Sequence, residues 1–97
     1  MKVYVNGKFY SKNEAAVSVF DHGLLYGDGV FEGIRAYERL VFRLESHIDR
    51  LYESAHTLMI DIPLSKKEME QAIVATLKEN KMEDGFFVTT IRCGEAK

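Results

Sequence analysis

The sequence has little of what marks a secreted, membrane-bound or nucleic-acid-binding protein. Its single cysteine, Cys93, cannot form an internal disulfide, which fits a cytoplasmic location. No apolar run approaches the ~20 residues of a transmembrane helix, and the first residues lack the charged and apolar regions of a secretion signal. A net charge of −2 gives no basic surface for DNA or RNA. We therefore expect a cytoplasmic protein without a membrane or nucleic-acid partner.

Metal-ligand spacing is also missing from the sequence. The three histidines, His22, His47 and His56, do not follow the spacing of a metal site, and no cysteine lies near them. A length of 97 residues, with 46% hydrophobic and 29% charged residues, is ordinary for one small globular domain. No metal is expected, and composition alone does not indicate a function.

Short runs of apolar and aromatic residues predict several strands. Asn6-Gly7 separates two of them, and this dipeptide favours the type I′ turn of a β-hairpin because both central residues need positive φ. Glu38-Arg39 is expected to be a second hairpin turn, and Asp84-Gly85 a further turn. The extended segments are expected at residues 2–5, 8–10, 17–20, 33–37, 40–42 and 86–91.

Two helices are expected between the second hairpin and the last turn. The first has an apolar stripe at helical spacing, formed by Leu44, Ile48, Leu51, Ala55, Leu58 and Met59. It is expected to end near Met59, because Pro63 disfavours the α conformation at residue 62. The second begins at the capping box of Ser65 and Glu68 and ends around Asn80. The order of elements predicts an α+β fold, with an antiparallel sheet and two helices packed on one face.

The most unusual stretch covers residues 19–37. Four of the seven glycines lie between Gly23 and Gly33, interleaved with aromatic and charged residues. Glycine serves where φ is positive or where another group must approach the backbone closely. Two interpretations stay open on composition alone: a backbone that lines a small-molecule site, or a glycine-rich turn that leads into a strand.

The same stretch resembles a known family. Tyr26-Gly27-Asp28-Gly29 followed by Val30-Phe31-Glu32-Gly33-Ile34-Arg35-Ala36-Tyr37 is similar to the opening signature of the class IV aminotransferases, the pyridoxal-phosphate (PLP) enzymes of fold type IV. The run from Phe42 to Leu51 resembles the family's second signature. Within the family, the segment after Val30 looks most like the branched-chain amino-acid aminotransferases.

This resemblance implies that residues 1–97 form the N-terminal small domain of a longer, two-domain enzyme. The lysine that forms the Schiff base with PLP lies in the second domain in the family, so no catalytic residue is expected here and the chain alone should be inactive. The implied reaction transfers the amino group of a branched-chain amino acid to 2-oxoglutarate through PLP. The family also implies a homodimer or larger homo-oligomer.

Arg50 is the cofactor-binding residue that the resemblance implies, because the arginine at this motif position binds the PLP phosphate in the family. A guanidinium suits a phosphate dianion, to which it can donate two parallel hydrogen bonds. From periodicity alone, a surface arginine paired with Asp49 or Glu53 is the alternative. His47 lies one turn earlier on the same helical face and is interpreted as a structural hydrogen-bonding residue.

Four residues look like parts of a substrate pocket for an aliphatic amino acid. Phe31 would supply an apolar wall, Tyr26 a hydroxyl, and Gly33 close backbone approach. Arg35 lies two residues beyond Gly33, so it should point to the same face of the strand. The alternatives are that Phe31 is a core residue and that Arg35 forms an exposed ion pair.

The sequence departs from the family near residue 86. Family members often have tyrosine and arginine where this chain has Phe86 and Val88, which removes a hydroxyl and a charge from the side that holds the substrate carboxylate. The substrate is therefore open, and a D-amino-acid aminotransferase or an aminodeoxychorismate lyase is an alternative. A non-catalytic domain that binds a related subunit is a third.

Overall fold

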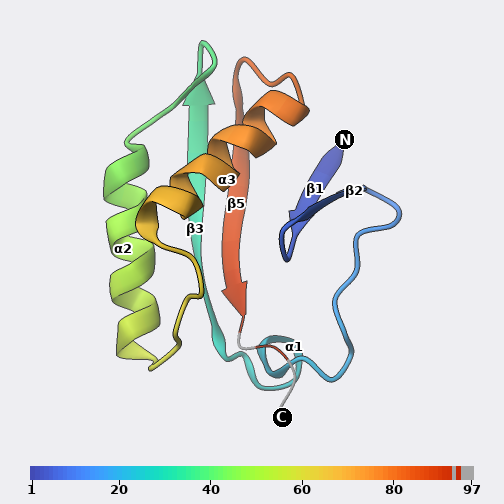
Figure 1. Cartoon of the computed structure of the whole chain (residues 1–97), viewed down its shortest axis with the longest axis vertical. Coiled ribbons are helices and arrows are strands. Elements are labelled where there is room, and N and C mark those ends of the chain that lie inside the picture. The colour runs from blue at the N-terminus through green and yellow to red at the C-terminus, as the bar shows by residue number, and fades with distance from the viewer. Residues whose placement is uncertain (93, 95–97) are drawn as a thin grey trace.

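A computed structural model describes residues 1–92 and 94 of the chain. Strands and helices alternate in blocks along the sequence (Figure 1). In chain order, the elements are β1 (Lys2–Val5), β2 (Lys8–Ser11), α1 (His22–Tyr26), β3 (Gly29–Tyr37), β4 (Leu40–Val41), α2 (Leu44–Thr57), α3 (Lys66–Glu79) and β5 (Gly85–Arg92).

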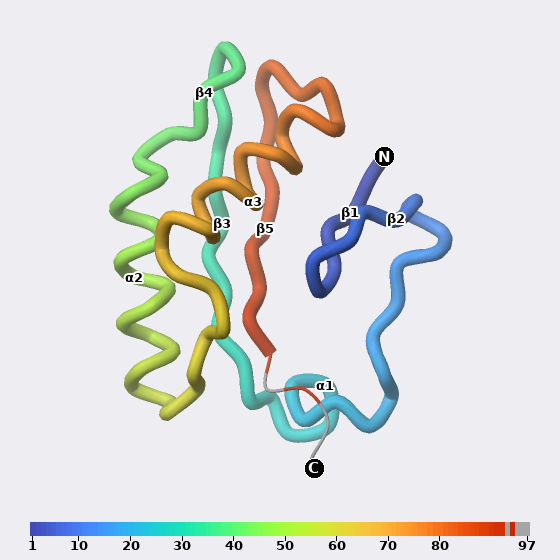
Figure 2. Tube along the Cα trace, in the orientation of Figure 1, coloured from blue at the N-terminus to red at the C-terminus, as the bar shows by residue number. Residues whose placement is uncertain are grey.

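The main sheet has three antiparallel strands in the order β4-β3-β5, and α2 and α3 both lie on one of its faces (Figure 1). This confirms the expected α+β fold with two helices on one side of an antiparallel sheet. The hairpin β1-β2 forms a second, separate sheet. Asn80, at the end of α3, holds this hairpin through two hydrogen bonds with the backbone of Lys2. A long connection then runs from β2 to α1 at the far end of the main sheet (Figure 2).

The core lies between β3 and the two helices. Every second residue of β3 is buried, and the apolar ones, Val30, Ile34 and Ala36, face the helices. Their main partners are Ile48, Leu51 and Ala55 of α2 and Met69 and Ile73 of α3. The strand period of two and the helix period of 3.6 therefore meet in one layer, as the sequence pattern predicts.

The second long helix, α3, begins as expected. Ser65 accepts a hydrogen bond from the Glu68 backbone N–H (3.1 Å), while the Glu68 carboxylate accepts one from the Ser65 N–H (2.9 Å). This reciprocal pair satisfies two backbone donors that the first turn of a helix leaves without partners.

Three local expectations need correction. Helix α2 ends at Thr57, before the predicted end near Met59, and Met59 has left-handed backbone (φ 58°) with an 83% exposed side chain. Residues 17–20, expected to be extended, form no strand, and β3 begins at Gly29 instead of residue 33. Helix α1 is not expected in a glycine-rich stretch. It forms because Asp21 caps its first turn by accepting from the Gly23 N–H, and Gly27 ends it in the left-handed conformation (φ 71°).

None of the helices in the described residues is long and apolar enough to cross a membrane.

Candidate functional site

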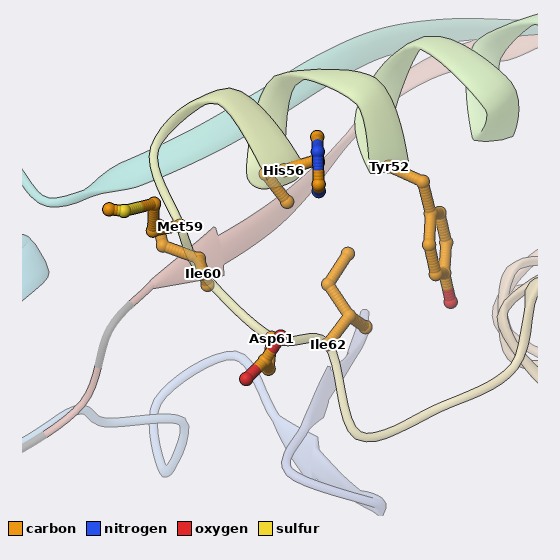
Figure 3. Close-up of a pocket in the computed structure, with 7 residues that line it drawn as sticks. Tyr52, His56, Met59, Ile60, Asp61 and Ile62 are labelled. Atoms are coloured by element: carbon orange, nitrogen blue, oxygen red, sulfur yellow. The ribbon is translucent and has the colours of Figure 1, made fainter.

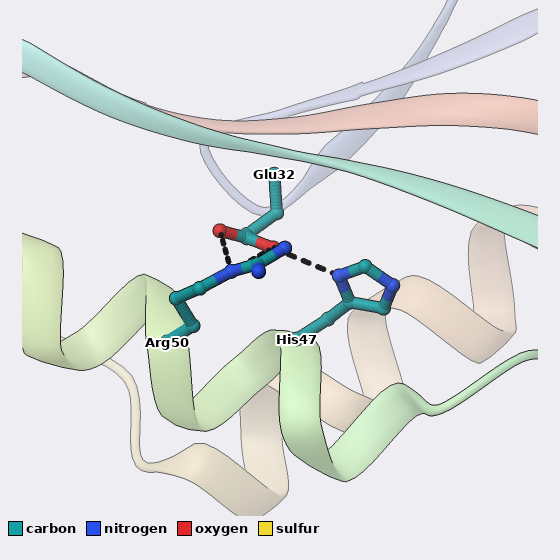
Figure 4. A network of polar contacts seen from close by, with 3 residues as sticks. All are labelled: Glu32, His47 and Arg50. Atoms are coloured by element: carbon teal, nitrogen blue, oxygen red, sulfur yellow. Dashed lines mark hydrogen bonds and ion pairs between the residues drawn. The ribbon is translucent and has the colours of Figure 1, made fainter.

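A buried carboxylate joins the two sequence signatures. Glu32 lies on the helix-facing side of β3, between Val30 and Ile34, and is only 7% exposed. Its side chain points from the strand toward α2, where it meets His47 and Arg50 (Figure 4). Residues 15 to 18 positions apart in the sequence thus form one hydrogen-bonded group.

Arg50 holds this carboxylate with two of its nitrogens. Nη2 donates to Glu32 Oε1 (2.7 Å), and Nε donates to Oε2 (2.9 Å), with a longer contact to Oε1 (3.1 Å). The alternative pairing of Arg50 with Asp49 is wrong, because the Asp49 carboxylate binds Lys66 Nζ (3.0 Å). The ion pair that Arg50 forms is with Glu32 of the neighbouring strand and not with Glu53 of its own helix.

His47 completes the group. Its Nδ1 lies 2.8 Å from Glu32 Oε1, and an ionised carboxylate can only accept, so Nδ1 carries the proton in this contact. This confirms that His47 is a structural hydrogen-bonding residue on the same helical face as Arg50. The bonds to Arg50 and His47 hold the pKa of Glu32 below its ordinary value, although burial alone would raise it. In turn, the hydrogen bonds and charge of Glu32 raise the pKa of Arg50.

Sequence reasoning assigns Glu32 no role, although a signal for it exists. It occupies a position of β3 where the alternation otherwise places apolar residues. A carboxylate on the apolar face of a strand needs a hydrogen-bonding or charged partner, and the basic residues of the neighbouring helix supply it.

The donors of Arg50 fit a phosphate group. A guanidinium has five N–H groups, and Glu32 faces the Nε–H and one Nη2–H. By its planar covalent geometry, the two Nη1–H groups and the second Nη2–H point away from Glu32. The Arg50 side chain is 65% exposed, so this second edge is accessible to an anion that accepts two parallel hydrogen bonds.

The predicted substrate residues lie on the opposite face of the sheet. Phe31, Gly33 and Arg35 alternate with the buried residues of β3 and all are exposed, as expected for residues that share one side of a strand. Phe31 is 70% exposed, so the interpretation of Phe31 as a core residue is wrong for this chain. Arg35 makes no ion pair within the described residues; its guanidinium lies 5.4 Å from the centre of the Phe86 ring.

Phe86 and Val88, the two departures from the family pattern, lie on this same exposed face. Val88 is directly opposite Gly33 in the pairing of β3 with β5, and Phe86 is opposite Arg35. A Cβ atom at Gly33 would lie 3.0 Å from the Phe86 ring, so the glycine leaves room for that ring. Arg92 does not replace the missing charge near Val88, because its guanidinium pairs with the buried Asp21 (3.2 Å).

Tyr26 is not part of this face. It lies on α1, before β3 begins, and its ring packs edge-on against His22 with 5.1 Å between the ring centres. The glycines around it have local reasons. Gly27 supplies the left-handed end of α1, and at Gly23 an added Cβ would lie 2.6 Å from the Cβ of Arg92. These two glycines serve the chain path and the packing against β5.

A pocket elsewhere contains none of the predicted site residues. It has a volume of about 300 Å³ and lies beside the end of α2 (Figure 3). Its lining consists of Tyr52, Ala55, His56, Met59, Ile60, Asp61 and Ile62. No group of three or more potential metal ligands occurs in the part of the chain that the structure describes.

Comparison with known proteins follows the same motifs. Residues 29–97 match the family model for amino-transferase class IV. A protein of Methanocaldococcus jannaschii named as a branched-chain-amino-acid aminotransferase is 57% identical over 94 residues, which are 97% of this chain and 33% of that protein. The aminodeoxychorismate lyase of Bacillus subtilis is 43% identical over 83 residues, 86% of this chain and 28% of the lyase.

Solved structures agree with the fold. The branched-chain amino acid aminotransferase of T.th., complexed with N-(5'-phosphopyridoxyl)-L-glutamate, superposes with a TM-score of 0.91 at 37% identity, over 99% of this chain and 34% of that one. The chain thus spans about a third of the length of the relatives it matches. With a family model that covers most of its residues and relatives that share both signatures, the chain belongs to the class IV aminotransferase family.

Proposed function

We propose that this chain is the N-terminal small domain of a PLP-dependent branched-chain amino-acid aminotransferase. The observation that carries the proposal is the position of Arg50, whose guanidinium is anchored on one edge by Glu32 and exposed on the other. This arrangement suits the phosphate of PLP, and relatives of this chain include a structure with a phosphopyridoxyl ligand. The 57% identity to the M. jannaschii protein supports branched-chain amino acids as substrates.

Each part of the site has a task in this proposal. Arg50 would bind the PLP phosphate, and Phe31, Gly33 and Arg35 would form a wall for the substrate. The two sets lie on opposite faces of β3, but β4 pairs only with Ala36 and Tyr37. Within the described residues, the edge of β3 from Gly29 to Ile34 has no strand on that side, and α2 runs alongside it (Figure 1). A bound cofactor and substrate could therefore contact both faces around this edge.

The chemistry itself would belong to groups outside the matched third of the relatives. PLP supplies an electron sink for breaking bonds at the α-carbon of an amino acid. A lysine in the rest of the protein would hold PLP and move the proton, and this chain alone would be inactive. Tyr26, which lies apart from the sheet face, would contribute its hydroxyl from another direction. A homodimer or larger homo-oligomer and a cytoplasmic location remain predictions.

The test of the proposal is a product assay on the full-length protein that carries this chain. Leucine with 2-oxoglutarate should give 4-methyl-2-oxopentanoate, at a rate well above that of keto-acid formation from D-alanine. Preference for D-alanine would assign a D-amino-acid aminotransferase. Pyruvate release from aminodeoxychorismate would assign the lyase, a relative of which is 43% identical.

A non-catalytic binding domain is the second candidate. The exposed sheet face, with Phe31, Phe86 and Val88, would suit packing against another domain or subunit. Size-exclusion chromatography at several concentrations, combined with PLP absorbance, separates the two functions. Self-association without PLP uptake would favour the binding domain, and PLP uptake would favour the enzyme.

A further inference from the structure

We propose that Glu32 is a positioning residue for Arg50, and that it acts on cofactor binding only through the phosphate group. The inference rests on the proposed function, because it needs Arg50 to bind the PLP phosphate. It adds a role for a residue to which neither the sequence nor the family match assigns one.

The first argument is the geometry of the guanidinium. Glu32 binds Nε and Nη2 through both carboxylate oxygens, at 2.9 and 2.7 Å. Two parallel hydrogen bonds fix the plane of the guanidinium as well as its position. The edge formed by Nη1 and the second Nη2–H is then held in one direction, ready for an anion. An exposed arginine without such a partner would have to lose its rotamer freedom when the anion binds.

The second argument is that Glu32 is itself held in place. It projects from β3 between the buried residues Val30 and Ile34, and its own side chain is 7% exposed. A third hydrogen bond, from His47 Nδ1, holds Oε1 at 2.8 Å. The carboxylate is thus a rigid anchor on a strand, and the flexible arginine stem is the part that it orders.

The third argument concerns the sign of the charge effect. Glu32 is an anion close to the proposed site of another anion, so by charge alone it would weaken phosphate binding. A positioning role predicts the opposite sign, because removing Glu32 would release the guanidinium. The two effects therefore predict opposite changes in affinity, and a measurement can separate them.

The experiment measures the affinity of the full-length protein for PLP and for pyridoxal, which lacks the phosphate. Glu32→Gln keeps the shape of the side chain but loses the charge and one of the two accepting oxygens. We expect the dissociation constant for PLP to rise about tenfold, as for the loss of one hydrogen bond to a charged group. The dissociation constant for pyridoxal should stay unchanged. Glu53→Gln, an exposed carboxylate three residues after Arg50 on α2, is the matched control and should change neither value.

A second variant guards against a folding defect. Glu32→Asp keeps the charge but is one methylene shorter, so it cannot reach both Arg50 nitrogens; it should also weaken PLP and leave pyridoxal unchanged. In an Arg50→Ala background, Glu32→Gln should have no further effect on PLP affinity.

The possible results are distinct. Tighter PLP binding by Glu32→Gln would overturn the inference in favour of simple charge repulsion. An equal loss of affinity for PLP and pyridoxal would overturn it in favour of a general structural role. Failure of the unmodified protein to bind PLP would overturn the proposed function, and the inference with it.

Discussion

At the scale of single residues, Glu32 carries the connection between the two sequence signatures. A carboxylate in a strand core has to be compensated, and here Arg50 and His47 compensate it. The sequence could predict that Arg50 and His47 share a helical face. It could not predict that Glu32 meets them, because the angle and offset between β3 and α2 depend on packing across the whole layer. Arg50 as a phosphate ligand comes from the family resemblance and stays a prediction.

Replacement of Arg50 by alanine is the direct test of that ligand. In the full-length protein, Arg50→Ala should raise the dissociation constant for PLP strongly, because the phosphate loses a bidentate, charge-assisted partner. Equilibrium titration of the apoprotein by PLP absorbance measures the change. Lys67→Ala, which removes an exposed cation of α3, controls for the loss of one positive charge. Equal PLP affinity in the Arg50 and Lys67 variants would refute the assignment.

Glu32 should also make stability depend on pH. Its pKa in the folded protein lies below the ordinary value of 4.5, because Arg50 and then His47 favour the ionised form. The stabilising effect is therefore complete above pH 4.5 and is lost as the pH falls through the lower, folded-state pKa. Hydrogen exchange of buried amides in β3 and α2 gives the free energy of unfolding from about pH 3 to 7. The difference between the unmodified protein and Glu32→Gln should be constant near neutrality and shrink in acid; a difference that grows in acid would contradict this account.

At the scale of elements, local signals predict what local interactions determine. The Asn6-Gly7 hairpin and the Ser65 capping box both lie where the sequence indicates them. Segments that depend on distant contacts are predicted less well. Helix α1 exists because Asp21 caps it and pairs with Arg92, which lies on β5 near the other end of the chain. Such a contact cannot be read from the segment itself.

The capping box gives a prediction at this scale. Ser65→Ala should lower the free energy of unfolding of α3 by about 1 kcal/mol, because the Glu68 N–H loses its acceptor. Hydrogen exchange of the amides in α3 reports this change. Ser46→Ala is the control: Ser46 is exposed inside α2, and alanine is the better helix former, so stability should stay equal or rise slightly. Equal effects at both serines would show that the cap contributes nothing.

At the scale of the whole molecule, one sheet separates the buried layer from an exposed face. The helices cover one side, and the other presents Phe31, Phe86 and Val88. Alternation in β3 predicts that Gly33 and Arg35 share a side, but it could not indicate which side the helices would cover. The chain's match to about a third of its relatives fits a face that packs against further protein.

The core itself should respond to truncation as its burial indicates. Leu51→Ala removes a side chain that is 1% exposed and in the middle of the layer, so it should cost about 2–5 kcal/mol of unfolding free energy. Leu58→Ala is the matched control, since the helix ends before Leu58 and its side chain is half exposed. Chemical denaturation compares the two variants. A larger effect at Leu58 would mean that the end of α2 is packed differently from this structure.

The central claim is that the Glu32–Arg50 pair holds the phosphate of PLP. A crystal structure of the full-length protein grown with PLP tests it most directly. We predict phosphate oxygens about 2.7–3.2 Å from Arg50 Nη1 and Nη2, with Nε and the other side of Nη2 still bound to Glu32. A phosphate held by other residues, with Arg50 bound only to Glu32, would contradict the claim.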